Sequence, residues 1–318
     1  MTKVYVFGHR NPDNDSICSA AAYAAFLAAD DDMPKDGGDE YIAARLGEVP
    51  PETAWLFDWL GATDKLPIPL PEVEVADDDE ALTVILVDHN EVAQSAPGID
   101  DMNIVGIVDH HRIGDIQTAA PISFVNLPYG STATIIAQRY LDTETPMPRW
   151  VAGVLLAALL TDTVILKSPT TTEVDIETCE LLAEALEIDA AEFGMTLFNK
   201  RSEATPFEAA VILTRDLKEY TKDGMVIGIV QYENVNLDAV NEHRSALVAS
   251  MKQIALSRGY DLFVFMATDI LREGTELFVV GETAFAETAF EVDFGSGSAW
   301  LDGVLSRKKQ VAAALMDA

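Results

Sequence analysis

The sequence is poor in basic residues. Its 318 residues include 53 Asp and Glu but only 21 Lys and Arg, which gives a formal net charge of −32 and an isoelectric point near 4.2. A protein that binds nucleic acid through the phosphates needs a basic surface that displaces counterions. The shortage of basic residues therefore argues against a general nucleic-acid-binding protein.

Cysteines and long apolar runs are also scarce. The two cysteines, Cys18 and Cys179, lie far apart, the chain has no CxxC motif, and we expect no secretory leader. A disulfide framework or a cysteine-based zinc site is therefore not expected. The longest apolar stretches, 17–29 and 151–160, are shorter than the roughly 18 residues that a membrane span needs. We expect a cytoplasmic protein without a membrane segment.

Apolar side chains and carboxylates, in contrast, are abundant. Hydrophobic residues make up 49% of the chain and the mean hydropathy is +0.12, which favours a sizeable core over disorder. The length favours two domains. The chain has 29 Asp and 24 Glu but only 10 Lys, a balance typical of a halophilic protein whose charge repulsion is screened by salt. An ordinary acidic cytosolic protein is the alternative interpretation.

The first half of the chain predicts an α/β domain with a mostly parallel sheet flanked by helices. Short apolar runs at 3–7, 83–87 and 104–108 are apolar on both faces, as in strands covered on both sides. Helices are expected at 17–29, with Ser16 as N-cap, and at 153–160 and 173–186. Ligands of such sheets gather at the carboxyl ends of the strands, where all three runs carry charged residues.

The second half predicts a smaller α/β domain. We expect helices at 207–220 and 237–257 and strands at 226–231, 261–267 and 277–281. The composition changes near 199–206, which we interpret as a linker between a domain at 1–198 and one at 207–318. Acidic stretches at 30–39 and 77–80 are expected to be solvated surface loops.

Four of the five histidines fall in three short motifs that also carry aspartates. The motifs are GHRNPDNDS, VDHNE and VDHH, and their candidate ligands are His9, Asp13, Asp15, Asp88, His89, Asp109, His110 and His111. Imidazoles with carboxylates and no thiolate suit Mn²⁺, Co²⁺, Fe²⁺ or Mg²⁺ better than structural zinc. So many carboxylates close together would repel one another unless divalent cations neutralised them.

Each motif also has a plainer interpretation. Asp88-His89 alone reads as a capping or surface pair, and the first motif alone as an Asx-turn cluster. Asp162, after the apolar helix at 153–160, could be a cap or an exposed residue, or a further ligand at a helix terminus, because an unpaired buried carboxylate is costly. Three such motifs at successive strand ends favour one shared metal site.

The run Arg307-Lys308-Lys309 is a second notable feature in so acidic a chain. It could be a solvated helix start near the C-terminus. It could also be an anion clamp, in which Arg offers a bidentate fork to phosphate and Lys a point charge. A carboxylate-rich site for two metal ions combined with a basic clamp is typical of enzymes that transfer phosphoryl groups to water.

Together the motifs resemble one family. GHRNPDNDS, LVDHNE, IVDHH, PYGSTATI, LLTDT, LKSPT and SRKKQ are similar, in order, to the motifs of the family II inorganic pyrophosphatases. These enzymes belong to the DHH phosphoesterase superfamily and carry a DHHA2-type C-terminal domain. The similarity extends from residue 4 to about residue 310, and the order of seven motifs makes it specific.

The resemblance implies a ligand set and a reaction. One metal ion would be held by His9, Asp13 and Asp88, and a second by Asp15, Asp88, His110 and Asp162, so that Asp88 bridges. Mn²⁺ or Co²⁺ would occupy these two sites, and Mg²⁺ would arrive with pyrophosphate. A metal-bridged hydroxide would attack one phosphorus and release two orthophosphates.

The resemblance also assigns the residues that would bind substrate. His111 would hydrogen-bond the phosphates, and Lys218, Arg307 and Lys308 would clamp them from the C-terminal domain, with the roles of Lys309 and Asp109 left open. Lys218 could instead be a surface residue of an amphipathic helix. The family implies a cytoplasmic homodimer. The acidic composition and the short apolar runs argue against contact with nucleic acid or membrane.

Two other functions stay open at this point. Another DHH phosphoesterase would act on oligonucleotides, cyclic dinucleotides or polyphosphate, but usually carries a GGGH-like motif, and the nearest match here, 295–298, has no His. A non-catalytic metal- or phosphate-binding protein could keep the fold, although all the ligand and clamp residues are present. A purely structural halophilic protein would leave the coincidence of the motifs unexplained.

Overall fold

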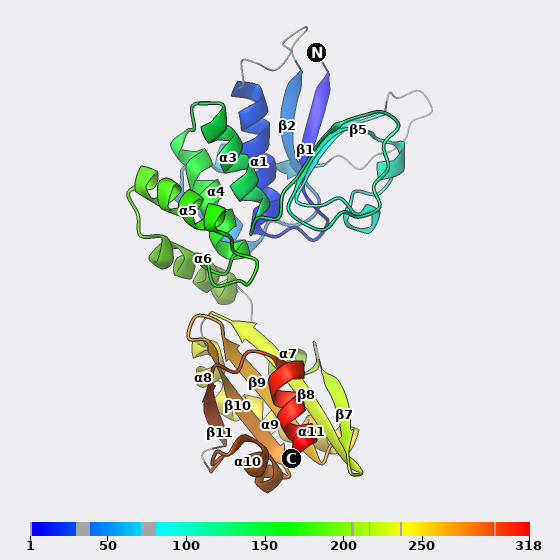
Figure 1. Cartoon of the computed structure of the whole chain (residues 1–318), viewed down its shortest axis with the longest axis vertical. Coiled ribbons are helices and arrows are strands. Elements are labelled where there is room, and N and C mark those ends of the chain that lie inside the picture. Colours follow the sequence, from blue (N-terminus) through cyan, green and yellow to red (C-terminus); the bar gives the residue numbers. More distant parts are fainter. Residues whose placement is uncertain are drawn as a thin grey trace. The chain divides into compact units, whose positions relative to one another are not determined.

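A computed structural model of the chain describes residues 2–29, 39–70, 81–204, 207–215, 217–235, 237–295 and 297–318. The chain divides into two compact units, Met1–Ala204 and Thr205–Ala318 (Figure 1). The acidic stretches expected at the surface lie outside the described residues, apart from Asp39. Among the described helices, none is both long and apolar enough to cross a membrane.

The first unit contains a six-stranded sheet in its described part, in the order β3-β2-β1-β4-β5-β6, and all of its neighbouring strands are parallel. The strands are β1 (Lys3–Phe7), β2 (Glu40–Arg45), β3 (Ile68–Pro69), β4 (Thr83–Val87), β5 (Asn103–Asp109) and β6 (Ser123–Asn126). The three predicted apolar strands are thus confirmed and lie side by side at the centre. The other three, shorter or more polar, were not predicted.

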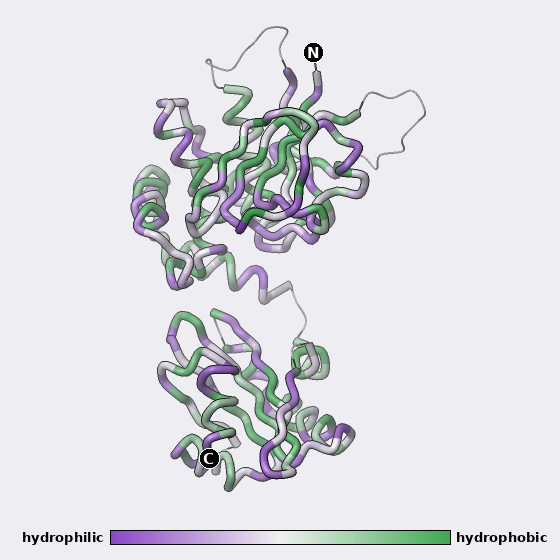
Figure 2. Tube along the Cα trace, turned by 45° about the vertical axis from the view of Figure 1, so that its right-hand side comes forward, coloured by the Kyte–Doolittle hydropathy of each residue, from purple (hydrophilic) through white to green (hydrophobic). Residues whose placement is uncertain are grey.

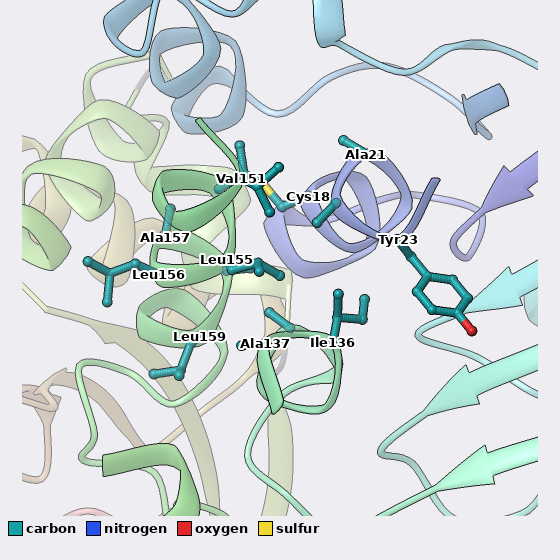
Figure 3. Packing of buried hydrophobic residues seen from close by; sticks show 14 of the residues in the cluster. Cys18, Ala21, Tyr23, Ile136, Ala137, Val151, Leu155, Leu156, Ala157 and Leu159 are labelled. Carbon is teal, nitrogen blue, oxygen red and sulfur yellow. The ribbon is translucent and has the colours of Figure 1, made fainter. Parts of the chain in front are cut away.

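Helices cover one face of this sheet in two layers, the first in contact with the strands and the second mainly in contact with other helices. They are α1 (Asn14–Ala29), α2 (Pro51–Trp59), α3 (Thr132–Asp142), α4 (Arg149–Asp162), α5 (Glu173–Leu186) and α6 (Ala190–Ala204). Figure 3 shows the core between α1, α3 and α4, where the small side chain of Cys18 on α1 lies beside Val151 of α4 and lets the two helices approach closely. The opposite face is covered by the segment that contains the short helices η2 (Val92–Gln94) and η3 (Ile99–Asp101).

Helix α1 begins three residues earlier than expected. Its first residue is Asn14, and the carboxylate of Asp13 accepts a hydrogen bond from the backbone N–H of Ser16 at 2.9 Å. Asp13 therefore acts as the cap, and the predicted N-cap Ser16 lies within the first turn. The prediction failed because Asp and Ser are both good caps and the polar loop offers several of them.

The second unit has a mixed sheet in its described part, in the order β11-β10-β9-β8-β7, with only β8 and β9 parallel. Its strands are β7 (Lys218–Lys222), β8 (Met225–Asn234), β9 (Leu262–Asp269), β10 (Gly274–Gly281) and β11 (Ser298–Asp302). One face carries α7 (Ala209–Arg215), α8 (Asp238–Glu242) and α9 (Arg244–Arg258), and the other α10 (Thr283–Phe290), the π-helical turn η4 (Arg307–Ala312) and α11 (Ala313–Asp317). In Figure 2 the inner strands are largely green, the hydrophobic end of the scale.

Three sequence predictions for this half differ from the structure. The helix expected at 207–220 ends at Arg215, and Lys218 begins strand β7 instead. Asp223 and Gly224, both with positive φ, form a two-residue hairpin turn between β7 and β8, a signal that the helical prediction overlooked. The helix expected at 237–257 is divided at His243 into α8 and α9, and α6 extends to Ala204, into the segment interpreted as a linker.

Candidate metal centre

The three histidine motifs converge at the carboxyl ends of the central strands. His9 follows β1, Asp88 follows β4, and His110 follows β5, and these strands are neighbours in the sheet. Because parallel strands end at the same edge, residues about 100 positions apart in sequence meet there. Asp162, the last residue of α4, reaches the same place from the helical layer.

One group of possible ligands forms around His9. Its Nε2 atom lies 3.6 Å from the Oδ2 atom of Asp13 and 3.4 Å from Oδ2 of Asp88. The three side chains offer donor atoms that all lie within 4.8 Å of one another, a spacing that a single cation can bridge. Asp13 combines this position with its role as the cap of α1, so the start of the helix fixes the loop that carries it.

A second group forms around His110. Its Nε2 atom lies 3.3 Å from Oδ2 of Asp162 and 3.4 Å from Oδ1 of Asp88. Asp15 joins His110 and Asp162 in a set whose donor atoms also lie within 4.8 Å of one another. The six residues proposed as ligands from the sequence are therefore brought together, in two groups.

Asp88 lies between the two groups. Its Oδ2 faces His9 and its Oδ1 faces His110, and its side chain is only 2% exposed. Its backbone has φ = +60°, a left-handed conformation that is uncommon for residues other than glycine. Strain of this kind often occurs at functional sites, and here it turns the carboxylate out of the strand direction into the cluster.

The hydrogen bonds of the two histidines leave one nitrogen on each ring for a cation. The Nδ1–H group of His9 donates to the carbonyl of Arg10, and that of His110 donates to the carbonyl of Tyr129, both at 3.0 Å. Since a carbonyl can only accept, Nε2 is the atom that points into the cluster. The buried Nε2 of His110 has no hydrogen-bond partner in the described part of the chain, as expected of a ligand atom.

The charges also fit a site for divalent cations. Burial and the neighbouring charges of Asp88 and Asp13 raise the pKa of Asp162 to about 7, and burial with Asp88 and Asp162 raises the pKa of Asp15 well above its usual value. The carboxylates of Asp15 and Asp162 are therefore costly to keep ionised without a counter-charge. Oxygen and imidazole donors without a thiolate are the set that Mn²⁺ accepts.

The start of helix α3 holds two of these carboxylates in place. The backbone N–H groups of Thr132 and Ala133 donate to Asp15 at 2.7 and 3.0 Å, and the hydroxyl of Thr132 donates to Asp88 at 3.0 Å. A helix N-terminus favours negative charge, so this end of α3 stabilises both aspartates. Thr132 was not among the site residues predicted from the sequence, although Ser131, the N-cap of α3, is a recognisable signal for a helix start.

The buried carboxylate of Asp175 holds the loop that leads into α3. Asp175 accepts hydrogen bonds from the N–H of Gly130 at 2.8 Å, from the hydroxyl of Thr134 at 2.6 Å, and from the N–H and hydroxyl of Thr172. Asp175 is also the third helical residue of a capping box at the start of α5. The motif T-x-x-D in the sequence was the available signal for it.

His111 lies beside the cluster and is oriented from behind. Its Nδ1–H donates to Oδ1 of Asp109 at 2.9 Å, and Asp109 also accepts the backbone N–H groups of His110 and His111. The amide of Asn90 donates to the other oxygen of Asp109. Burial opposes ionisation of Asp109, but these hydrogen bonds outweigh it and lower its pKa. Nε2 of the half-exposed His111 therefore faces away from Asp109.

His89, the remaining histidine of the motifs, lies outside both groups. Its Nδ1–H donates to the carbonyl of Val87 at 2.9 Å, and its Nε2 accepts the hydroxyl of Ser95 at 2.7 Å. Both ring nitrogens are therefore occupied, and burial lowers the pKa of the imidazole. His89 fixes the loop after β4 and has no lone pair to offer a cation.

A cavity of about 180 Å³ opens beside the cluster. It brings two of the candidate ligands and His111 together with neutral and charged side chains of the loops after β4 and β5. Its lining consists of His9, Asp88, His89, Asn90, Glu91, Gln94, His111 and Arg112. Most of these groups can donate or accept hydrogen bonds, which suits a small polar ligand rather than an apolar one.

The proposed clamp residues belong to the second unit and share one face of its sheet. Lys218 pairs with Ile229 across β7 and β8, so the two side chains lie on the same face. Ile229 belongs to the apolar cluster that contains Val311 of η4. The turn η4 begins with Arg307, whose N–H donates to the side chain of Gln231, two residues beyond Ile229 on β8. Lys308 and Lys309 are exposed.

Comparisons with known proteins agree with this organisation. The model of the DHH family, N-terminal domain, matches residues 3–159, and the DHHA2 domain model matches residues 195–318. A relative from Archaeoglobus fulgidus with the name "Probable manganese-dependent inorganic pyrophosphatase" is 40% identical, over 97% of this chain and 95% of its own. A Listeria innocua relative with the same name is 37% identical, over 100% of this chain and 99% of its own.

A solved structure gives the same result. The crystal structure of a Methanococcus jannaschii protein assigned as a family II inorganic pyrophosphatase has a TM-score of 0.61 to this chain and 34% sequence identity, and covers 99% of this chain and 98% of its own. The likeness extends over both units, in sequence as well as in fold. The chain therefore belongs to the family II inorganic pyrophosphatases, which combine a DHH and a DHHA2 domain.

Proposed function

We propose that this protein hydrolyses inorganic pyrophosphate to two orthophosphates. The observation that carries the proposal is the pair of histidine–aspartate groups that share Asp88 and open on a small polar cavity. The full-length relatives named as inorganic pyrophosphatases support the choice of substrate.

Two divalent cations would be held by the chain's own side chains. His9, Asp13 and Asp88 would bind one of them, and Asp15, Asp88, His110 and Asp162 the other. When bound, such cations polarise phosphate oxygens and lower the pKa of water at the site. The relatives' names favour manganese; we infer that Co²⁺ can replace it and that Mg²⁺ accompanies the substrate.

His111 is the side chain best placed to contact the substrate in this unit. It lines the cavity, and its Nδ1–H bond to Asp109 leaves Nε2 for a phosphate oxygen. Because Asp109 is fully buried and fixed by two backbone N–H groups, the imidazole has little freedom to turn away. A positioned imidazole of this kind can hold a phosphate oxygen or donate a proton to it.

The second unit would supply further positive charge for the two phosphates. Lys218, Arg307 and Lys308 lie on one face of its sheet or at the start of η4, and we propose that they bind the two phosphates. Arg307 would act as a bidentate donor, and the lysines as point charges. In this division of labour, residues 1–198 hold the cations and residues 207–318 hold the substrate.

Several finer properties belong to the same proposal. We infer a cytoplasmic homodimer that contacts neither nucleic acid nor membrane. The ratio of 53 acidic to 21 basic residues supports adaptation to high salt, because screening removes much of the repulsion within so acidic a protein. Measurements of activity and of mass in solution across KCl concentration test the salt adaptation and the dimer together.

The substrate is tested by competition between phosphate anions. The chelated protein receives Mn²⁺, and phosphate release is measured with pyrophosphate, tripolyphosphate and a short oligonucleotide. We expect pyrophosphate to be hydrolysed at least about a hundredfold faster than the others, a difference of roughly 2.7 kcal/mol in transition-state stabilisation. Comparable rates on the longer substrates would identify a general DHH phosphoesterase instead.

A further inference from the structure

A second cavity lies in the first unit, at the carboxyl ends of β2 and β3. Its volume is about 680 Å³, and none of its lining residues is among the six candidate metal ligands. The lining consists of Arg10, Asn11, Arg45, Leu46, Gly47, Glu48, Pro69, Leu70, Ala96, Pro97 and Met102. It therefore combines two guanidinium groups with an apolar wall, whereas every residue that lines the cavity at the metal centre has a polar side chain.

The two arginines of this cavity have only backbone partners within the described ranges. The Nη1 group of Arg10 donates to the carbonyl of Ala93 at 3.3 Å, and Arg45 donates from Nε to the carbonyl of Pro67 at 3.1 Å and from Nη1 to that of Gly47. Neither guanidinium forms an ion pair with a carboxylate of that part of the chain. Each carries five N–H donors, so most of them stay available.

What distinguishes this cavity is that two such guanidiniums line it together, in a chain where acidic residues outnumber basic ones by 53 to 21. Elsewhere in the described part of the chain, some arginines pair with a glutamate, as Arg112 does, and others donate to a backbone carbonyl, as Arg149 does. Two guanidiniums without a carboxylate partner on one cavity attract an anion, and their planar forks suit a phosphate-type head with two charges. Glu48, the one acidic residue of the lining, opposes the binding of an anion.

The apolar wall determines what else the ligand carries. Leu46, Leu70, Ala96, Pro97 and Met102 contribute aliphatic surface without an aromatic ring. Burial of a compact apolar group against such a wall is favourable, whereas a bare inorganic anion has no apolar surface to bury there. We propose that this cavity is an accessory site for a small organic anion, with a dianionic phosphate-type head against Arg10 and Arg45 and a compact apolar body against the wall.

The cavity adjoins the metal centre without being part of it. The backbone N–H of Arg10 donates to the carbonyl of Gln94 at 2.7 Å, and Gln94 lines the smaller cavity whereas Ala96 lines the larger one. The segment 93–96 is therefore a wall between the two. For this reason the test must distinguish an anion in the accessory cavity from one held at the metal centre.

The probe is phenylphosphonate, which has a phosphate-like head, an apolar body and no hydrolysable ester. Its binding to the full-length Mn²⁺-loaded protein is measured by calorimetry at low salt. We expect Arg45→Met to weaken binding by about tenfold or more, because one charge-assisted contact is lost, and Glu48→Gln to strengthen it several-fold. Inorganic phosphate, which lacks the apolar body, should bind this cavity more weakly than the probe.

Controls separate this site from the general charge and from the metal centre. Lys65→Met removes an exposed basic residue paired with Asp64, and it should leave binding unchanged. Asp88→Asn alters the metal centre and should also leave it unchanged. Four results would each overturn the proposal. The probe could lose its binding in Asp88→Asn or keep its full affinity in Arg45→Met. Inorganic phosphate could bind as tightly as the probe, or the probe could fail to bind at concentrations up to about 10 mM. If Arg45→Met fails to fold, the opposite shift expected for Glu48→Gln decides the question.

Discussion

The carboxylate of Asp109 lies 2.9 Å from Nδ1 of His111 and is itself completely buried. This contact determines which nitrogen of the imidazole faces the cavity, since an ionised carboxylate can only accept a hydrogen bond. Asp109 thereby acts on the proposed substrate contact without touching the substrate. It resembles the outer partners that orient ligands at metal sites.

Replacement of Asp109 should separate catalysis from metal binding. An amide in Asp109→Asn keeps the shape but loses the charge that holds the imidazole, so we expect kcat for pyrophosphate to fall about 10–100-fold. The affinity for Mn²⁺, followed by electron paramagnetic resonance, should change much less. Asp142→Asn, an exposed position at the end of α3, is the matched control. Unchanged kcat in Asp109→Asn would show that His111 needs no such partner.

Asp175 should be the most sensitive position outside the candidate ligands. Asp175→Ala leaves the buried donors of Gly130, Thr134 and Thr172 without an acceptor, and we expect a loss of about 3 kcal/mol in the free energy of unfolding. Chemical denaturation of the metal-free protein measures it. Glu177→Ala, on the exposed side of the same helix, should change stability by less than about 0.5 kcal/mol. Equal losses in both variants would contradict the role of Asp175.

The stability of the metal-free protein should fall as the pH rises above neutrality. Burial lowers the pKa of His9, but hydrogen bonds and charges from Asp13 and Asp88 outweigh it and raise the value to about 11. Burial likewise opposes protonation of His110, yet Asp88, Asp15 and Asp162 raise its pKa to about 10. Both imidazoles therefore bind protons more tightly in the folded than in the unfolded chain.

This difference in pKa determines the direction in which stability changes with pH. The stabilisation is fully present below the unfolded pKa of about 6.5 and is lost as the pH rises through 10 to 11. Thermal unfolding of chelated protein between pH 6.5 and 10 should show a falling midpoint, with a smaller slope in His9→Gln. Mn²⁺ should reverse the trend, because its binding displaces these protons and strengthens as the pH rises. A flat profile without metal would contradict the charged pairs.

The centre of the first sheet could be predicted because its strands are apolar on both faces and end in charged residues. That local pattern is enough to place His9, Asp88 and His110 at one edge of the sheet. The residues that hold this cluster together could not be found in the same way. Thr132 meets Asp15 across 117 positions and Asp175 meets Gly130 across 45, and only the folded chain makes such pairs.

Lys218 shows where local helix propensity fails to predict the structure. The segment 207–220 has the composition of a helix, yet the hairpin turn at Asp223-Gly224 and the pairing with β8 place Lys218 on a strand. Tertiary pairing commonly overrides a weak helical preference. The consequence is functional, since the strand places Lys218 on the face that also carries η4.

The proposed clamp can be tested by comparing the two faces of the second sheet. Arg307 begins η4 on one face, whereas Lys252 is an exposed residue of α9 on the other. Loss of a charged hydrogen bond to phosphate costs roughly 1.5–3 kcal/mol, so Arg307→Ala should lower kcat/KM for pyrophosphate by about 10–100-fold.

The same change should leave the Mn²⁺ affinity of the protein intact, because the candidate ligands all lie in the first unit. Lys252→Ala removes equal charge from the same unit and should reduce kcat/KM by less than about twofold, as expected for an exposed residue away from the substrate. Steady-state kinetics of the two variants at one ionic strength distinguish a specific clamp from general attraction. Equal losses in both would assign η4 no part in binding the phosphates.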